Sequence, residues 1–291
     1  MIQVVFNGLF SGAVACLVGI GFSLIYRTAR FFHFSHGIVF TSGAYFTFLF
    51  YVWLGQPLLF SILLSIIAST LLGCVMEVFV YRPLNHKGAS PQLLFLASLG
   101  IYVVLQNIIS TVFGDAPKTI RSGVVEEGIN ILGARVTPIQ ILIIGVSIVL
   151  VVMVAVLLKK TKMGRAMRAV ANDPELAKVS GIESDRVILW TFAAGSALAS
   201  IAGILMALDV DMTPTMGMNA LMMGAVASII GGIRSIPGVA LGALLLGMAQ
   251  HMGAWKISSQ WQDAIAFFIL LVFLLFRPQG FLGRKVRKAT V

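Results

Sequence analysis

The chain contains 291 residues, of which 58% are hydrophobic and only 11% are charged, and its mean hydropathy is +0.97. Soluble globular proteins carry about 25% charged residues, so this composition argues against a water-soluble enzyme or a nucleic-acid-binding module. The net charge of +10 is concentrated in short basic clusters between long uncharged stretches. This distribution is typical of a polytopic membrane protein with basic cytoplasmic loops.

The first apolar segment has the charge pattern of a membrane span rather than of a removable signal. No charged side chain occurs between Met1 and Tyr26, and the first positive charges are those of Arg27 and Arg30. A secretory signal peptide carries its positive charge before the apolar run. The stretch 13–16 weakly resembles a lipoprotein cleavage box, but more apolar sequence follows it directly. We therefore expect a first span whose N-terminus lies outside the cell.

Nine segments are candidate spans, since a crossing needs about 20 apolar residues. They are residues 3–26, 31–54, 57–80, 91–113, 138–158, 187–208, 218–233, 236–254 and 261–276. With the N-terminus outside, nine crossings place 17 of the 21 Lys and Arg side chains in the cytoplasm and 4 outside. The positive-inside rule favours this orientation and disfavours its inverse. If 218–233 and 236–254 form a re-entrant pair, seven full spans remain and both termini keep their sides.

The segment 218–233 is unusual in its length and its glycine content. Its 16 residues correspond to about 24 Å of helix, which is less than a full crossing. Eight glycines fall between Gly217 and Gly253, and such runs either let helices pack closely or mark a broken helix that lines a pathway. The residues expected to serve in helix packing or a helix break are Gly231, Gly232, Pro237, Gly238 and Gly242.

The predicted fold is therefore an all-α polytopic transmembrane helical bundle of seven to nine spans, forming a single domain over residues 1–291. The connection 114–137 balances three basic and three acidic residues, and it is expected to be a small ordered extracytoplasmic loop. The connection 159–186 and the tail 277–291 are strongly basic. Both are expected in the cytoplasm.

The 159–186 connection contains two predicted short helices. Met163, Met167 and Val170 share one helical face, and the intervening arginines project elsewhere. A second helix is predicted to start at 172–175, which supplies a capping side chain, a proline in the first turn and an acid near the positive end of the dipole, and to stop at Gly181. Two interpretations stay open: a basic loop on the lipid surface, or a docking element that lies in a partner's groove.

The sequence contains no motif that indicates catalysis or cofactor binding. No G-x-x-x-x-G-K-[ST], H-E-x-x-H, C-x-x-C or G-x-S-x-G occurs, so no catalytic, cofactor-binding or metal-binding residue is predicted. Polar residues inside spans are functional candidates because hydrocarbon leaves them without partners. The candidates for a pathway or for polar contacts in the bundle are Ser35, His36, Gln106, Asn107, Asn219 and Ser228. Glu77 is expected to pair with Arg82 at the membrane interface.

Methionine is concentrated late in the chain. Eight of the 13 methionines lie between Met206 and Met252. Methionine adapts to irregular apolar surfaces, so these residues are predicted either to fill the core or to form a flexible lining for a small hydrophobic solute.

Several short blocks of sequence form a recognisable series along nearly the whole chain. They are Asn7-Gly8-Leu9, Phe34-Ser35-His36-Gly37, Gly43-Ala44-Tyr45, Tyr81-Arg82-Pro83-Leu84, Leu105-Gln106-Asn107, Thr161 to Ala169, Pro214 to Gly217, Gly231 to Gly238 and Arg277 to Gly280. These blocks and their order resemble the inner-membrane permeases of branched-chain amino acid ABC importers, specifically the permease that begins with an N-G-L span. Two departures are the stretch 28–33 and Arg234, which stands where a small residue is common.

The resemblance implies a multi-pass permease of the bacterial inner membrane that works by alternating access in the lipid bilayer. It implies a second homologous permease, two cytoplasmic ABC ATPases that use the ATP, and a periplasmic or other extracytoplasmic solute-binding protein. Permeases of urea and short-chain amide importers share nearly all these motifs and are the alternative. The residues expected to couple to the ATPases are Met163, Gly164, Arg165, Met167, Arg168, Pro174, Glu175, Leu176, Val179 and Gly181.

The distribution of basic residues makes the predicted topology testable. A cysteine that replaces Ser122 in an otherwise cysteine-free chain should react in intact cells with an impermeant thiol reagent. A cysteine that replaces Ser184 should react only after the membrane is opened. Equal labelling of the two positions from outside would contradict the assignment of sides.

Overall fold

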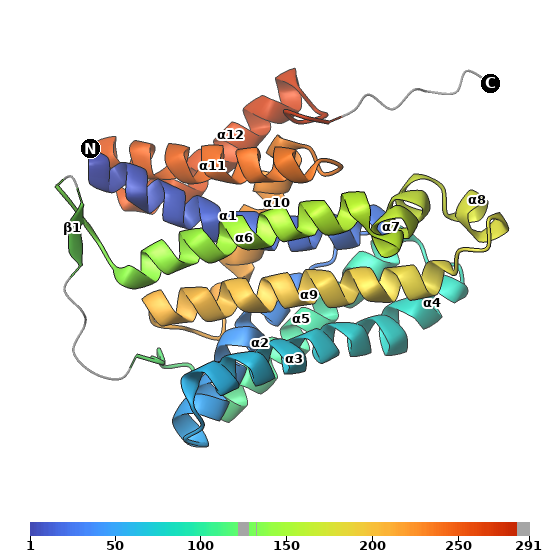
Figure 1. Cartoon of the computed structure of the whole chain (residues 1–291), viewed down its shortest axis with the longest axis horizontal. Helices are drawn as coiled ribbons and strands as arrows, with labels where there is room; N and C mark the ends of the chain where they lie inside the picture. Colours follow the sequence, from blue (N-terminus) through green and yellow to red (C-terminus); the bar gives the residue numbers. More distant parts are fainter. Residues whose placement is uncertain (122–127, 132, 284–291) are drawn as a thin grey trace.

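Helices make up most of the chain in the computed structural model, which describes residues 1–121, 128–131 and 133–283 (Figure 1). The helices are α1 (Ile2–Ala29), α2 (His36–Phe48), α3 (Leu58–Met76), α4 (Arg82–His86), α5 (Pro91–Phe113), α6 (Pro138–Lys160), α7 (Lys162–Asn172), α8 (Pro174–Val179), α9 (Ser184–Asp209), α10 (Met216–Gly231), α11 (Ile236–Lys256) and α12 (Gln262–Phe276). Strands β1 (Ile129–Ile131) and β2 (Ala134–Val136) pair antiparallel within the 114–137 connection. Ser122 and residues 284–291 of the tail lie outside the described residues.

Within the part of the chain that the structure describes, seven helical runs are long and apolar enough to cross a membrane, as the predicted helical bundle requires. They are Ile2–Ala29, Leu58–His86, Pro91–Phe113, Pro138–Lys160, Ser184–Asp209, Ile236–Lys256 and Ser259–Phe276. The sixteen residues of α10 form a shorter apolar helix. The run Leu58–His86 is continuous because a π-helical turn, Glu77–Tyr81, joins α3 to α4.

The expected span 31–54 differs from the observed helix at its start. Arg30 adopts left-handed backbone angles (φ 58°, ψ 25°) and ends α1, and the next helical residue is His36. Residues 31–35 instead form the turn between α1 and α2. A π-helical turn, Leu49–Trp53, extends α2 to nearly the predicted end of the span.

Hydrogen bonds between segments far apart in sequence mark the two ends of the bundle. At the first end, which we call the N-terminal end, the Gln3 side chain bonds both the backbone N–H (2.8 Å) and the carbonyl oxygen (3.0 Å) of Arg135. At the opposite end, which we call the basic end, Arg30 donates to the Asn172 carbonyl oxygen (3.1 Å). Figure 1 shows the N-terminus and β1 at one end and α7 and α8 at the other. The charge distribution predicts that the basic end faces the cytoplasm.

Helices α1 and α9 form the centre of the bundle, whereas α3, α5 and α12 expose large apolar side chains around it. The buried face of α3 carries small residues at every fourth position, namely Ser61, Ser65, Ser69 and Gly73. A helix buried on most sides and outer helices with apolar outward faces are expected where lipid replaces water.

Glycines allow the central helices to approach within backbone contact. A Cβ on Gly21 of α1 would lie 2.8 Å from the Gly195 carbonyl oxygen of α9, and one on Gly195 would lie 2.9 Å from that of Gly21. Gly37 of α2 and Gly217 of α10 face each other in the same reciprocal way. Small residues at helix crossings are the usual device for close packing in membranes.

The predicted glycine-rich run contains both a turn and a close contact. Gly232, with φ +98°, ends α10, and the Ser235 hydroxyl accepts the Gly238 N–H at the start of α11 (3.2 Å). Pro237 lies in the first turn of α11, where its missing N–H costs no helical bond. Side chains at Gly231, Gly238 or Gly242 would overlap the backbone of the facing helix.

These contacts predict that the same substitution changes the thermal unfolding temperature differently at two glycines. Gly231→Ala should lower the thermal unfolding temperature of the purified chain, because its methyl group would overlap the Gly238 carbonyl. Gly100→Ala on α5 should leave the temperature unchanged or raise it, because no atom lies within 4 Å of a Cβ there and alanine favours a helix by about 1 kcal/mol. Equal unfolding temperatures for the two variants would contradict the close α10–α11 packing.

Candidate functional site

Two features of the bundle are candidates for function: the short helices at the basic end and a cavity near the N-terminal end. Helix α7 starts where the Thr161 hydroxyl accepts the Gly164 N–H (3.0 Å). Gly164 itself packs against the backbone of Leu158 at the end of α6, so no side chain fits there. This contact folds residues 161–182 back against the bundle.

Helix α7 packs one apolar face against its neighbours. Val170 is buried with Ala177 and Val187, and Met163 and Met167 pack partly buried around them. Arg165 is exposed and Arg168 is half-buried. The helical periodicity of the sequence therefore located the inward face of α7.

Helix α8 presents apolar side chains that nothing in the described chain covers. The Asp173 carboxylate caps it by accepting the N–H groups of Glu175 and Leu176, both at 3.0 Å, and Gly181 at φ +78° follows its end. Ala177 is buried, but Leu176 is 63% and Val179 86% exposed. Two large apolar side chains projecting together from a polar segment are characteristic of an interaction surface.

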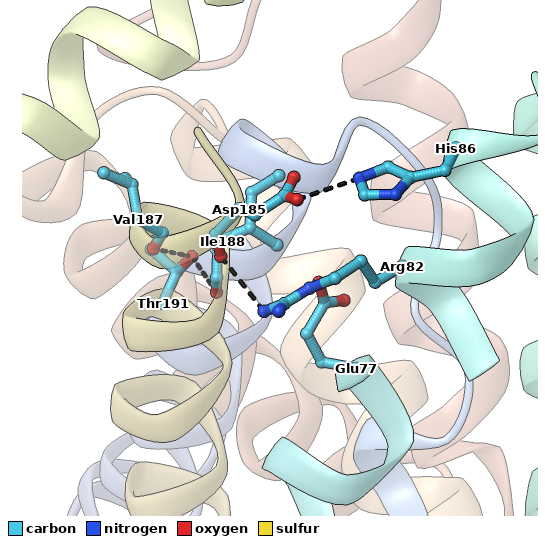
Figure 2. Close-up of polar contacts among 7 residues, drawn as sticks. All are labelled: Glu77, Arg82, His86, Asp185, Val187, Ile188 and Thr191. Carbon is cyan, nitrogen blue, oxygen red and sulfur yellow. Dashed lines mark hydrogen bonds and ion pairs between the residues drawn. The ribbon is translucent and has the colours of Figure 1, made fainter. Parts of the chain in front are cut away.

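Polar contacts join the end of the third span, Leu58–His86, to the start of α9 (Figure 2). His86 lies 2.8 Å from the Asp185 carboxylate at the start of α9, and Arg82 donates to the Asp185 carbonyl oxygen (3.4 Å). The predicted Glu77–Arg82 ion pair is present, with 3.7 Å between Nε and Oε1. The Thr191 hydroxyl donates to backbone carbonyls one turn earlier in α9. Arg82 and His86 at the end of Leu58–His86 and Asp185 at the start of α9 therefore join these two elements.

Three of the polar candidates lie in cross-helix hydrogen bonds inside the bundle. The Ser35 hydroxyl donates to the Ser98 carbonyl oxygen and lies 3.1 Å from the Tyr81 hydroxyl. His36 Nε2 lies 3.2 Å from the Val18 carbonyl oxygen. The Ser228 hydroxyl donates to the Gly19 carbonyl oxygen of α1 (2.9 Å).

The other three polar candidates lie apart from these contacts. Gln106 is half-buried and Asn107 is exposed on α5, and the Asn107 amide donates to the Val103 carbonyl oxygen of its own helix (2.8 Å). Asn219 lies on α10 and lines a cavity. The structure thus does not bring the six polar candidates together at one site.

The cavity next to Asn219 has a volume of about 520 Å³ and is lined by residues of α1, α2, α6, α9, α10, α11 and α12. Its walls are largely apolar and include Phe10, Val14, Phe40, Met206, Met216 and Met223. Polar residues that line it include Asn7, Asn219, Gln250, His251 and Asp263. An apolar cleft of this size with a few converging polar groups is the usual form of a small-molecule site.

Sequence reasoning missed several of the groups around this cavity. Asn7 belongs to one of the sequence blocks that resemble the permease family, but that block does not indicate which cavity Asn7 lines. Gln250, whose amide donates to the Gln262 carbonyl oxygen (3.2 Å), is an intrahelical polar residue that the hydropathy pattern did not single out. Polarity within a span was the signal that could have found Gln250.

The comparison with known proteins agrees with this arrangement of helices. The family model described as branched-chain amino acid transport system / permease component matches residues 4–274. The chain belongs to this permease family. Members of the family are membrane transport proteins, so the apolar helices described above span a membrane.

Individual relatives match over almost their full length. The high-affinity branched-chain amino acid transport system permease protein BraD of Pseudomonas aeruginosa is 33% identical over 97% of this chain and 96% of its own. The permease protein LivH of Escherichia coli is 32% identical over the same shares of the two chains. The structure of PsaBC from Streptococcus pneumoniae in complex with Fab aligns with a TM-score of 0.54 and 12% identity over 96% of this chain and 92% of that chain, which supports the fold alone.

Proposed function

We propose that this permease imports branched-chain amino acids across the bacterial inner membrane as one transmembrane subunit of an ATP-driven importer. The observation that carries the proposal is the full-length match to branched-chain amino acid permeases together with the apolar cavity inside the bundle. The remaining subunits are a second homologous permease, two cytoplasmic ATPases and an extracytoplasmic solute-binding protein.

The chemistry of the cavity fits an amino acid with an aliphatic side chain. Phe40, Met206 and Met223 supply an apolar wall that a branched side chain can contact. The amides of Asn7 and Asn219 can bond a carboxylate, and Asp263 can attract an ammonium group. Urea lacks an aliphatic part that could contact these apolar walls. The relatives with full-length matches are branched-chain amino acid permeases. Together these observations favour branched-chain substrates over the urea or amide alternative.

The exposed face of α8 is the proposed contact with an ATPase. Leu176 and Val179 lie three residues apart and share one side of the helix. A hydrophobic groove of a partner would cover them, while Glu175 and Lys178 would stay at its polar rim. Because α7 and α8 pack against the start of α9, movement of the ATPases would be transmitted to the central helices.

A charge at Leu176 should separate coupling from folding. In cells that lack this chain, the parent should restore leucine uptake and should not restore urea uptake. Leu176→Asp should abolish leucine uptake and ATPase co-purification, because a buried unpaired carboxylate is strongly unfavourable at an apolar interface. The variant should insert at normal abundance because Leu176 is exposed in the chain itself.

Lys178→Ala serves as the control because Lys178 is an exposed residue of the same helix. It should retain uptake and the bound ATPases. If Leu176→Asp transports leucine at the parent rate with its ATPases bound, α8 is not the docking helix and the lipid-surface interpretation of 159–186 holds. If the parent restores no leucine uptake, the proposed substrate is wrong.

A further inference from the structure

A second cavity, of about 630 Å³, lies at the basic end of the bundle and is separate from the proposed substrate cavity. Four parts of the chain form it: the end of α1, the end of α7, the turn between α10 and α11, and residues 278–283. Its lining includes Tyr26, Arg27, Arg30, Asn172, Arg234 and Gln279. We call it the arginine cavity.

The arginine cavity collects positive charge that the protein does not neutralise. Among the described residues, three arginines and no aspartate or glutamate line it. Within the described residues, all four ion pairs lie elsewhere, at Arg82, His86, Arg121 and Arg186. In the same part of the chain, Arg27 and Arg234 make no hydrogen bond through their side chains, and Arg30 bonds only a backbone carbonyl, that of Asn172.

A fourth arginine, Arg168, lies next to the cavity and increases the unbalanced charge. Arg168 and Arg27 line the same narrow gap between α1 and α7. The Nη1 atom of Arg168 is buried and has no hydrogen-bond partner among the described residues. Arg168 and Arg234 are both close enough to Arg27 to repel it electrostatically.

The walls of the arginine cavity are held in place by backbone contacts. The N–H of Phe281 donates to the Ile230 carbonyl oxygen (2.8 Å), and that of Leu282 donates to the Gly231 carbonyl oxygen (3.1 Å). These bonds fix the segment 278–283 against the turn that presents Arg234. The sequence after Gly283 contains four basic residues and no acidic one, so it supplies no acidic side chain as a counter-charge.

Arg27 and Arg168 are half-buried, whereas Arg30 and Arg234 are exposed. Half-buried positive charges without partners, such as those of Arg27 and Arg168, are unfavourable unless an anion joins them. The planar guanidinium fork suits phosphate oxygens, which it can bond in a bidentate manner. We propose that the arginine cavity binds a phosphate group, carried either by the headgroup of an anionic phospholipid or by a soluble phosphate compound. The position of Arg27 at the end of a spanning helix suits a headgroup, since basic pockets between transmembrane helices on the cytoplasmic side bind such lipids.

A bound phosphate would join α7 to the bundle. Arg27 belongs to α1, Arg234 follows α10, and Arg30 contacts Asn172 at the end of α7. An anion shared by these groups would hold α7 and α8 against α1 and the α10–α11 turn. The proposal concerns this chain's own cavity and does not depend on which solute is transported.

The test measures the thermal unfolding temperature of the full chain in nanodiscs of zwitterionic phosphatidylcholine. One arm replaces part of the lipid with phosphatidylglycerol, and the other adds inorganic phosphate to the zwitterionic discs. The variants are Arg27→Gln/Arg234→Gln and a control, Lys159→Gln/Lys160→Gln. The control removes the same charge from exposed residues at the end of α6, outside the cavity.

The parent and the control should unfold at a higher temperature in at least one arm, and that arm identifies the source of the phosphate. Arg27→Gln/Arg234→Gln should lose this gain, because its affinity for the phosphate group should be at least roughly tenfold weaker. Each basic side chain near an anionic surface contributes a factor of about ten in binding affinity or slightly less. Without an anion it should unfold at or above the parent temperature, because the substitution removes repulsion and no hydrogen bond. A purely structural role would lower its unfolding temperature in every condition.

Three results would overturn the proposal: no gain for the parent in either arm, an equal gain for parent and Arg27→Gln/Arg234→Gln, or an equal loss in both double variants, which would indicate general surface charge. Arg234→Gln alone changes only an exposed side chain on a turn. If the double variant does not fold, the single variant provides the same comparison.

Discussion

The backbone-to-backbone approach of the central helices is the constraint on which the other features depend. Lipid tails are as apolar as leucine, so helices in a membrane gain little from hiding apolar surface and rely on close packing and interhelical hydrogen bonds. The reciprocal contacts Gly21–Gly195 and Gly37–Gly217 bring α1 to α9 and α2 to α10. His36 of α2 and Ser228 of α10 also bond carbonyl groups of α1. The core is therefore held by geometry that leaves little room for change.

This tightly packed core leaves space only in particular places. Near the N-terminal end, methionine and phenylalanine side chains surround the apolar cavity. At the basic end, the arginine cavity lies where α1, α7 and the α10–α11 turn meet. Between the two, Val18, Gly19 and Ser228 are buried in close contact. Alternating access through such a bundle would involve movement of whole helices rather than deformation of the core.

Local patterns in the sequence predicted the features that depend on local physics. Hydropathy located the apolar helices, helical periodicity located α7, and capping residues located α8. Spacing along one helix indicated the Glu77–Arg82 pair. Hydropathy did not reveal that residues 31–35 form a turn before α2, because three of these five residues are phenylalanines. The apolar cavity and the cluster of Arg27, Arg168 and Arg234 could not be predicted, because residues far apart in sequence form them only once the helices pack.

If the apolar cavity lies on the path of the substrate, a substitution that fills it should block transport. Ala220 of α10 lines the cavity, whereas Ala264 of α12 is exposed and does not line it. Leucine uptake should be measured in proteoliposomes that contain the whole importer with Ala220→Trp or with Ala264→Trp. We expect Ala220→Trp to abolish uptake while its ATPases remain bound, and Ala264→Trp to transport at the parent rate. Uptake by Ala220→Trp at the parent rate would show that the substrate does not pass through this cavity.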